Sequence, residues 1–363
     1  MKKRTILLFS VCLLFGCNPE PAEDNSTPFL DAEIQNFQVN TSIRALEVID
    51  DRHVWYAGAG GKYGVTTDGG VTWRHDSIEI EGTFPEFRAI ASTSDAVFLL
   101  SVASPALLYR SDDNGQSWQL VYTESGEGVF YDAMVFMDDM NGVAMGDPVD
   151  GCISVILTGD GGQTWSKISC ENLPPAEAGE GAFAASNTNI ATSGSHIWIA
   201  TGGGTARIYH SADKGKTWEV HQTPIIQGGT MTGIFTVDFY DENNGIIFGG
   251  DWERKTISKS NKAVTSDGGK TWELISDGIG PGYRSCIRYV PGAGGRSMIA
   301  VGIPGIAYSF DSGRHWQLIS DEDFYTVRFT PSGDAAWLAG NGKIARMTLK
   351  TSGAHLTVPK NAQ

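Results

Sequence analysis

The sequence predicts an all-β protein, and more specifically a seven-bladed β-propeller, on the basis of three observations. Glycine and tryptophan are frequent, at 45 and 10 of 363 residues, while charged residues make up only 19%. This composition is typical of short strands joined by tight turns, not of helices. A pattern of eight residues ending in tryptophan occurs six times, with 44 to 54 residues between successive tryptophans. That spacing suits one four-stranded blade for each copy.

The repeated pattern is S/T-x-D-x-G-x-T/S-W, known as the Asp-box; the sixth copy has His315 in place of the second hydroxyl residue. We expect the aspartate to accept hydrogen bonds within the turn, the glycine to take a positive φ, and the tryptophan to pack between sheets. The pattern lacks the full set of oxygen ligands of a calcium loop. The boxes are therefore predicted to be structural, and their aspartates and tryptophans are Asp68, Trp73, Asp113, Trp118, Asp160, Trp165, Asp213, Trp218, Asp267, Trp272, Asp311 and Trp316.

Each box is preceded by alternating apolar runs that are typical of strands. A seventh such run begins at Phe324, continues through residues 336–340 and has no box after it. The alternating segment 32–41 precedes the first blade, and we expect it to supply the last strand of the seventh blade, closing the ring without an exposed edge. The propeller is thus predicted to span residues 32–350. The alternative is a six-bladed ring with an extra hairpin.

The N-terminus has the features of a bacterial lipoprotein signal peptide over residues 1–16. Three basic residues are followed by an apolar run of about eleven residues, too short to span a bilayer. The run ends in Gly16-Cys17, which resembles a lipobox in which Cys17 is acylated; the alternative is an ordinary signal peptide cut nearby. Residues 17–31 are predicted to be a flexible acidic and proline-rich tether, and residues 351–363 a C-terminal tail. We therefore expect an exported protein, lipid-anchored to the cell envelope at the outer membrane, on its periplasmic or its surface side.

Three cysteines lie in the body of the chain, and export permits disulfides. Cys152 and Cys170 flank the turn at residues 158–165, so a hairpin folded there places them opposite each other at disulfide distance. We expect this pair to be bonded, with two buried thiols as the alternative. Cys286 lies in an apolar stretch and is interpreted as a core thiol.

The direction of the strands predicts which end of the propeller binds. Within each blade the Asp-box turns lie at one end, and the loops of unequal length lie at the other, where binding usually resides. The same end carries the start of every innermost strand. The candidate binding residues at this end are Arg44, Arg88, Tyr131, Asp132, Asp147, Trp252 and Arg284.

Two interpretations of these residues remain open. Arg44, Arg88 and Arg284 form a carboxylate-binding cluster, or each arginine pairs with an acid such as Asp132 and closes the channel. Trp252 and Tyr131 either offer stacking surfaces to a ligand or belong to the core.

Other functions find little support in the sequence. A net charge of −15 argues against nucleic acid or an anionic membrane surface as partner, leaving the lipid as the only membrane contact. The sequence contains no dinucleotide fingerprint, phosphate-binding loop or serine-hydrolase elbow, and its seven histidines show no metal-ligand spacing. We therefore expect no cofactor and no metal.

The repeats are similar to those of the BNR/Asp-box superfamily, and particularly of the photosystem II stability/assembly-factor family. The repeat of that family corresponds in this chain to residues 239–249 followed by the Asp-box from Thr265 to Trp272. The resemblance implies a seven-bladed propeller without known catalysis that binds protein partners through an arginine-rich patch, for which Arg44, Arg88 and Arg284 are the candidates. The predicted function is a non-catalytic scaffold for protein partners in the envelope.

The alternative function is a carbohydrate-active enzyme or a glycan-binding protein that uses the same face. Sialidases share the Asp-box and place three arginines around the channel. They also need a tyrosine nucleophile with a glutamate partner, for which Tyr283 and Glu180 are on the right face.

Overall fold

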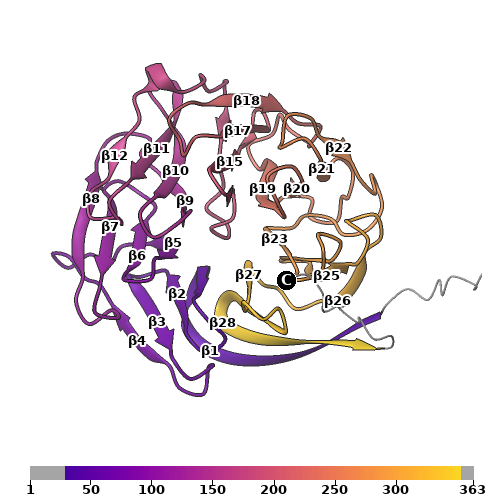
Figure 1. Ribbon diagram of the computed structural model, residues 1–363, viewed down its shortest axis with the longest axis horizontal. Coiled ribbons are helices and arrows are strands. Elements are labelled where there is room, and N and C mark those ends of the chain that lie inside the picture. Colours follow the sequence, from indigo (N-terminus) through magenta and orange to yellow (C-terminus); the bar gives the residue numbers. More distant parts are fainter. Residues whose placement is uncertain (1–28, 353–363) are drawn as a thin grey trace, which may run out of the picture.

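The computed structural model describes residues 29–352, whose strands surround a central axis (Figure 1). The expected signal peptide, Cys17, almost all of the tether and almost all of the C-terminal tail lie outside the described residues. Within the described range, no helix is both long and apolar enough to cross a membrane. The helical structure there is the short 3-10 helix η1 (Cys170–Asn172).

The described strands form six hydrogen-bonded sheets. Four of them have four strands each: β5 (Phe87–Ser92), β6 (Val97–Ser101), β7 (Ala106–Ser111) and β8 (Gln119–Glu124); β9 (Tyr131–Phe136), β10 (Gly142–Val149), β11 (Cys152–Thr158) and β12 (Ser166–Lys167); β14 (Ile190–Ser193), β15 (His196–Ala200), β17 (Arg207–Ser211) and β18 (Glu219–Gln222); and β23 (Cys286–Tyr289), β24 (Met298–Gly302), β25 (Gly305–Ser309) and β26 (Gln317–Ser320).

The other two sheets have six strands each. One contains β13 (Glu180–Gly181), β16 (Gly202–Gly203), β19 (Thr232–Phe239), β20 (Gly245–Asp251), β21 (Lys262–Thr265) and β22 (Glu273–Leu274). The other contains β27 (Thr326–Phe329), β28 (Ala335–Ser352), β1 (Phe29–Val48), β2 (Val54–Gly58), β3 (Lys62–Thr66) and β4 (Arg74–Ser77).

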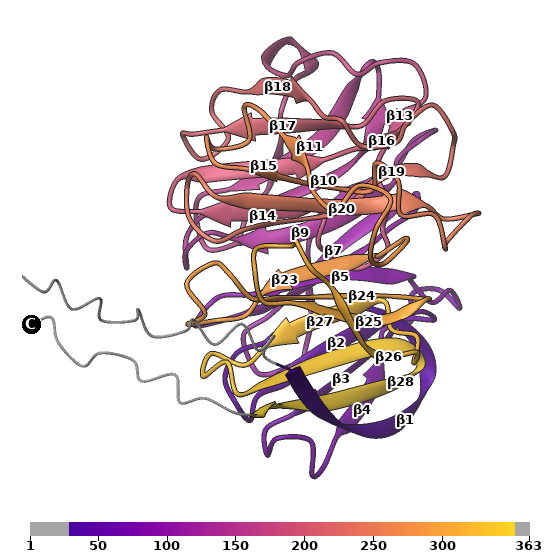
Figure 2. The ribbon, with the colours of Figure 1, turned by 90° about the vertical axis from the view of Figure 1, so that its right-hand side faces the viewer.

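The prediction of seven blades is wrong: the sheets make a six-bladed propeller, and the strands expected to form a seventh blade share a sheet with the first. The cause is the 20-residue strand β1, which pairs with β28 from Phe29 to Ser42 and with β2 from Ile43 to Val48. The N-terminal segment does pair with the C-terminal strand as predicted, and Figures 1 and 2 show these two long strands running together. The hairpin β27–β28 is thereby added to the sheet that contains β1 to β4.

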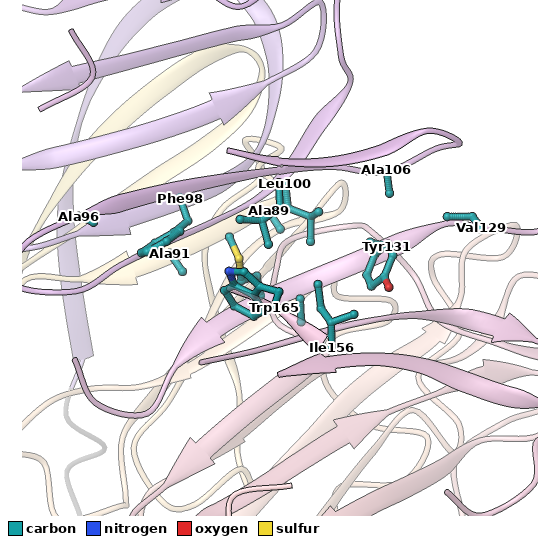
Figure 3. Packing of buried hydrophobic residues seen from close by; sticks show 13 residues of the cluster. Ala89, Ala91, Ala96, Phe98, Leu100, Ala106, Val129, Tyr131, Ile156 and Trp165 are labelled. Carbon is teal, nitrogen blue, oxygen red and sulfur yellow. The ribbon is translucent and has the colours of Figure 1, made fainter. Parts of the chain in front are cut away.

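The burial of each strand depends on its place in a sheet that packs between two neighbouring sheets. The second strands are buried at all or most of their residues, as in β6 (VFLLS), because both of their faces contact adjacent sheets. The outer strand β4 (RHDS) is exposed at every residue. The core therefore consists of clusters between adjacent sheets. One such cluster, between β5–β8 and β9–β12, contains Phe98, Tyr131 and Trp165 (Figure 3).

The Asp-boxes form the predicted turns. In the first box the two side-chain oxygens of Asp68 accept hydrogen bonds from Thr66 Oγ1 at 2.8 Å and Thr72 Oγ1 at 2.6 Å. The Thr66 hydroxyl accepts one from Gly70 N at 2.9 Å, and Gly70 has a φ of 92°. In the sixth box His315 Nδ1 lies 2.5 Å from Asp311 Oδ2, so the imidazole takes the place of the hydroxyl.

The box tryptophans pack against aromatic rings of neighbouring strands and sheets. Trp118 lies edge-on to Trp55, with ring centroids 6.4 Å apart, and Trp165 lies edge-on to Phe98 at the same distance. These contacts join adjacent sheets at the box end.

Candidate functional site

A cavity of about 600 Å³ opens among the loops of unequal length, and we call it the rim cavity. Its walls come from the β10–β11 hairpin (Asp147, Pro148), from Trp252 after β20, and from the connections between successive sheets, chiefly residues 179–185 and 230–231. By strand direction these loops lie at the end of the propeller opposite the Asp-boxes. The cavity therefore lies at the end where the sequence predicts binding.

Arg44 and Arg88 line this cavity, each placed by a β-bulge at the start of an innermost strand. The β1–β2 register shifts between Ile43 and Ala45, and the β5–β6 register shifts between Phe87 and Ala89. A bulged residue has no partner in the ladder, and its side chain is re-aimed away from the alternating pattern.

The same irregularity recurs in two further sheets. Asp132 is skipped between β9 and β10, and Phe235 is skipped between β19 and β20. Because these bulges occur at equivalent positions, they direct two arginines, an aspartate and a phenylalanine inward. The sequence alignment of innermost strands identified the first three but missed Phe235.

The two arginines are close enough to affect each other. Burial, and then the positive charge of Arg88, lowers the pKa of Arg44 from its ordinary value. The Arg44 guanidinium lies 4.3 Å from the centre of the Tyr325 ring, and no carboxylate contacts it in the part of the chain that the structure describes. Arg88 pairs with Glu86 at 3.2 Å, with both side chains partly exposed. The pair therefore offers positive charge to the cavity that internal acids neutralise only in part.

An aromatic wall lies beside this charge. The rings of Phe183 and Phe235 are stacked with centroids 3.8 Å apart, and Tyr283 lies edge-on to Phe235 at 4.7 Å. Trp252 also lines the cavity, is 38% exposed, and has Lys255 Nζ 4.0 Å from its ring centre. The cavity thus combines guanidinium groups with apolar surface.

Asp147 and Asp132 lie near the arginines without pairing with them. Asp147 Oδ1 accepts a hydrogen bond from Ala182 N at 2.7 Å, and burial raises the pKa of Asp147. Asp132 is fully buried, and neither of its oxygens has a hydrogen-bond partner among the described residues. Burial, followed by the charge of Asp147, raises the pKa of Asp132 well above its ordinary value, which favours the neutral acid. The alternative in which Asp132 pairs with an arginine is therefore not observed.

Besides Asp132, two further candidate residues do not line the cavity. Arg284 is 2% exposed and donates a hydrogen bond from one guanidinium nitrogen to its neighbour's carbonyl oxygen, Tyr283 O, at 2.8 Å. Tyr131 is 1% exposed within the core cluster of Figure 3, and its hydroxyl donates to Glu124 at 2.7 Å. At the cavity the expected cluster of three arginines is thus a pair. For Tyr131 the structure supports the core alternative, because alternation turns this ring between the sheets.

The chain that leads to β14 continues from the cavity wall and crosses the centre of the ring. Asn187 Nδ2 donates to Ile90 O, and Asn187 Oδ1 accepts from Met134 N, both at 2.8 Å. On the other side of the channel, Thr326 Oγ1 donates to Ser186 O at 3.0 Å. The segment 186–189 therefore bonds to strands on opposite sides of the ring.

The tyrosine and glutamate needed by a sialidase are not paired in this arrangement. The Glu180 carboxylate is buried in an ion pair with Arg207, and it also accepts a hydrogen bond from Thr201 Oγ1 at 2.6 Å. Burial raises the pKa of Tyr283 well above its ordinary value, although the charge of Arg44 opposes this. A buried, protonated phenol without a glutamate base is a poor nucleophile.

The described residues that could hold a metal lie away from this cavity. His210, Glu219 and His221, on β17 and β18, place one potential ligand atom each within 4.8 Å of one another. Spacing along the sequence did not identify them. These residues could have been found from the Asp-box, because His210 and Glu219 directly flank one box. The turn of that box brings the two residues opposite each other.

Cys152 and Cys170, the predicted pair, form a disulfide with an S–S distance of 1.99 Å. Cys286 is a free thiol and is buried.

Comparison with known proteins agrees with this architecture. Residues 109–120 match the family model described as "BNR/Asp-box repeat". A curated relative, the photosystem II assembly lipoprotein Ycf48 of Synechococcus sp. (strain CC9902), is 24% identical over 177 residues, which is 48% of this chain and 47% of the relative. The chain thus matches about half the length of that curated relative.

Solved structures show the same fold. The structure described as YCF48 bound to D1 peptide has a TM-score of 0.64 at 18% identity, over 87% of this chain and 96% of the other. YCF48 from Cyanidioschyzon merolae has a TM-score of 0.63 at 14% identity, over 87% and 98%. The sequence repeats, the fold and the curated relative together show that this chain is a BNR/Asp-box β-propeller related to the Ycf48 photosystem II assembly lipoprotein family.

Proposed function

We propose that this protein is a non-catalytic, exported and lipid-anchored scaffold that binds a protein segment in the rim cavity during assembly in the cell envelope. The observation that carries the proposal is the pair Arg44 and Arg88 beside an aromatic wall, in a cavity of about 600 Å³. Guanidinium groups bind carboxylates with charge-assisted hydrogen bonds, and aromatic rings add apolar contact. The segment bound is therefore a peptide that carries a carboxylate next to an apolar side chain.

Two comparisons support this proposal. A propeller of the same fold has been solved with a D1 peptide, so peptide binding has a precedent in this architecture. The curated relative is named a lipoprotein, which supports export and anchoring through Cys17. The D1 peptide is the ligand of the solved YCF48 structure, and the peptide that this chain binds is to be identified by experiment.

The test is peptide binding measured by fluorescence polarisation. A panel of short peptides ending in an apolar residue with a free carboxylate is compared with the same peptides amidated at the C-terminus, and with versions that carry an internal acid. We expect Arg44→Ala and Arg88→Ala each to weaken the binding of the carboxylate peptides by about 10- to 100-fold, the range expected when a hydrogen bond to a charged group is lost.

Arg52→Ala is the matched control. Arg52 is exposed in the turn between β1 and β2, at the Asp-box end, and its carbonyl oxygen accepts a hydrogen bond from Gly69 N. Its substitution should leave peptide binding unchanged. Equal binding by wild type and the Arg44→Ala/Arg88→Ala double variant would contradict the proposal. The natural partner would then be sought by capture from envelope extracts of the same cell, with the double variant as the negative control.

A further inference from the structure

The sheet of β14, β15, β17 and β18 follows the sheets that contain β1, β5 and β9 along the chain, and we call it the fourth sheet. Its outer strands bring together two histidines and a glutamate. His210 on β17 pairs directly with Glu219 on β18, and His221 lies two residues further along β18 on the same face. The Asp-box turn between His210 and Glu219 fixes this pairing, since its side-chain hydrogen bonds hold the hairpin closed. The side chain of His210 is 5% exposed, that of His221 is 19% exposed, and that of Glu219 is 52% exposed.

Two of the three distances between the ligand atoms are close to those around a tetrahedral metal ion, and all three are within 4.8 Å. Glu219 Oε1 lies 2.9 Å from His210 Nδ1 and 3.2 Å from His221 Nε2. Ligands at about 2.05 Å from a tetrahedral Zn²⁺ lie roughly 3.3 Å from one another. Small side-chain movements would therefore place all three atoms at bonding distance from one ion. The exposed side of Glu219 leaves a fourth position open to water.

One of these ligand atoms is otherwise unsatisfied. His221 Nε2 is buried and has no hydrogen-bond partner among the described residues, because its contact with Glu219 lacks hydrogen-bond geometry. Buried ring nitrogens normally have a hydrogen-bond partner, and the contact of this one is the Glu219 carboxylate at 3.2 Å, so a metal ion between the two groups would satisfy it.

A third histidine, His196, contacts the ring of His210 on the side away from Glu219. His196 Nδ1 lies 2.9 Å from His210 Nε2, so the two rings share a hydrogen bond on the side away from Glu219. The His210 ring is also stacked on Trp198, with centroids 5.4 Å apart. Metal-bound histidines typically have such a partner on the second nitrogen, which fixes the orientation of the ring and leaves the first nitrogen for the metal.

The arrangement is not a general feature of the Asp-box. The other five boxes place different residues at the three equivalent positions: Val65, Arg74 and Asp76; Arg110, Gln119 and Val121; Leu157, Ser166 and Ile168; Val264, Glu273 and Ile275; and Tyr308, Gln317 and Ile319. None of these sets combines two imidazoles with a carboxylate. The ligand set is therefore particular to the fourth sheet and is not required by the turn.

We infer that His210, Glu219 and His221 form a binding site for a divalent transition-metal ion of the class that includes Zn²⁺. Two imidazole nitrogens and one carboxylate oxygen are a ligand set that Zn²⁺ accepts, with water completing the tetrahedron. The site is separate from the rim cavity, as none of the three residues lines that cavity.

The test is direct metal binding by the full chain, purified without a polyhistidine tag. Isothermal titration with Zn²⁺ should give one ion per chain, and the absorption spectrum with Co²⁺ should show the bands of a four-coordinate site. His221→Ala and Glu219→Gln should each weaken Zn²⁺ binding by at least tenfold. His196→Phe keeps an aromatic ring but removes the supporting hydrogen bond, and it should weaken binding by about 10- to 100-fold.

His75→Ala is the matched control, because His75 is an exposed histidine of β4, on a different sheet from the proposed metal site, and its Nδ1 lies 2.8 Å from the Tyr56 hydroxyl. It should bind Zn²⁺ like the wild type. Thermal unfolding in the absence of metal checks that each variant is folded. The inference is overturned if the wild type takes up no stoichiometric Zn²⁺, or if His221→Ala and Glu219→Gln bind it as tightly as the wild type, which would place the ion elsewhere.

Discussion

Removal of the disulfide should lower the free energy of unfolding by about 3 kcal/mol. Cys152 and Cys170 are 18 residues apart, and the bond ties the start of β11 to η1. Closing a loop of this length restricts the unfolded chain, and the chain-entropy model gives about 3 kcal/mol at 25 °C for that restriction. The variant is Cys152→Ala/Cys170→Ala, which leaves no unpaired thiol at this position.

The loop held by the disulfide has other contacts that should keep it folded in the variant. Ala176 N donates to Gly151 O at 2.8 Å, and the Arg207 guanidinium donates to Pro175 O at 2.9 Å. The loop leads directly to residues 179–185 of the rim cavity. We therefore expect a stability loss from the unfolded state with little change in the folded structure, and peptide binding within about threefold of the wild type.

Thermal unfolding followed by circular dichroism measures the effect. With an unfolding entropy of about 2.1 cal/mol/K per residue, 3 kcal/mol corresponds to a decrease in Tm of roughly 4–5 °C for a cooperative unit of this size. Reductant should lower the Tm of the wild type by a similar amount and leave that of the variant unchanged. A change below about 1 °C would refute the entropic reasoning, and a loss well above 10 °C would mean that the bond holds the native loop in place.

Three further predictions concern the turns, the channel and the core. Hydrogen bonds from the turn lower the pKa of Asp68, Asp213 and Asp267 to about 2. The stabilisation from these carboxylates is therefore complete above about pH 4 and is lost as the pH falls towards 2. The Tm should decrease between pH 5 and pH 2, and a constant Tm would contradict the stabilising role of these hydrogen bonds. Asn187→Ala removes two hydrogen bonds across the channel and leaves a buried donor and a buried acceptor unpaired, which should cost about 2–5 kcal/mol in urea unfolding; a cost under 1 kcal/mol would show that water replaces the amide. Phe98→Ala empties the space of a fully buried ring between two sheets and should cost about 3–5 kcal/mol by the same measurement, whereas a cost near 1 kcal/mol would mean that the neighbouring sheets close the gap.

The features that the sequence predicted correctly are those that repeat or that depend on a single turn. All six boxes appear as hairpins because their hydrogen bonds are local, linking residues at most four positions apart, as in Asp68 and Thr72. The disulfide was predictable for the same reason, since one turn places its two cysteines on neighbouring segments. The pairing of β1 with β28 followed from the need to close the ring.

The number of blades could not be read in the same way. It depends on whether the register shifts between Gln38 and Ser42 and between Ile43 and Ala45 end one strand or bend it. Alternation of apolar residues looks the same in both cases. In this chain the strand continues through both irregularities, and so the two predicted blades share one sheet.

Of the seven candidate residues, four line the rim cavity, namely Arg44, Arg88, Asp147 and Trp252, and the sequence analysis missed Phe235. A bulge changes which way a side chain points without altering the apolar pattern around it, so Phe235 had no signal in the sequence. Arg284 looked equivalent to Arg44 by alignment. Arg284 instead lies before the start of β23 and not at a bulge within that strand, and its side chain is buried in the protein.

The departures from the repeat concentrate around the fourth sheet, and this concentration bears on function. The repeat stabilises the fold, since Asp-boxes, buried second strands and aromatic contacts between sheets recur around the ring. Residues 171–189 before the fourth sheet instead supply a cavity wall, an internal ion pair and the segment that crosses the ring. The outer strands of the same sheet carry the histidines and the glutamate. Segment 186–189 crosses the ring beside this cavity, bonded to strands on opposite sides of it. We therefore expect a peptide that binds the rim cavity to enter from the loop end, where Arg44 and Arg88 line it.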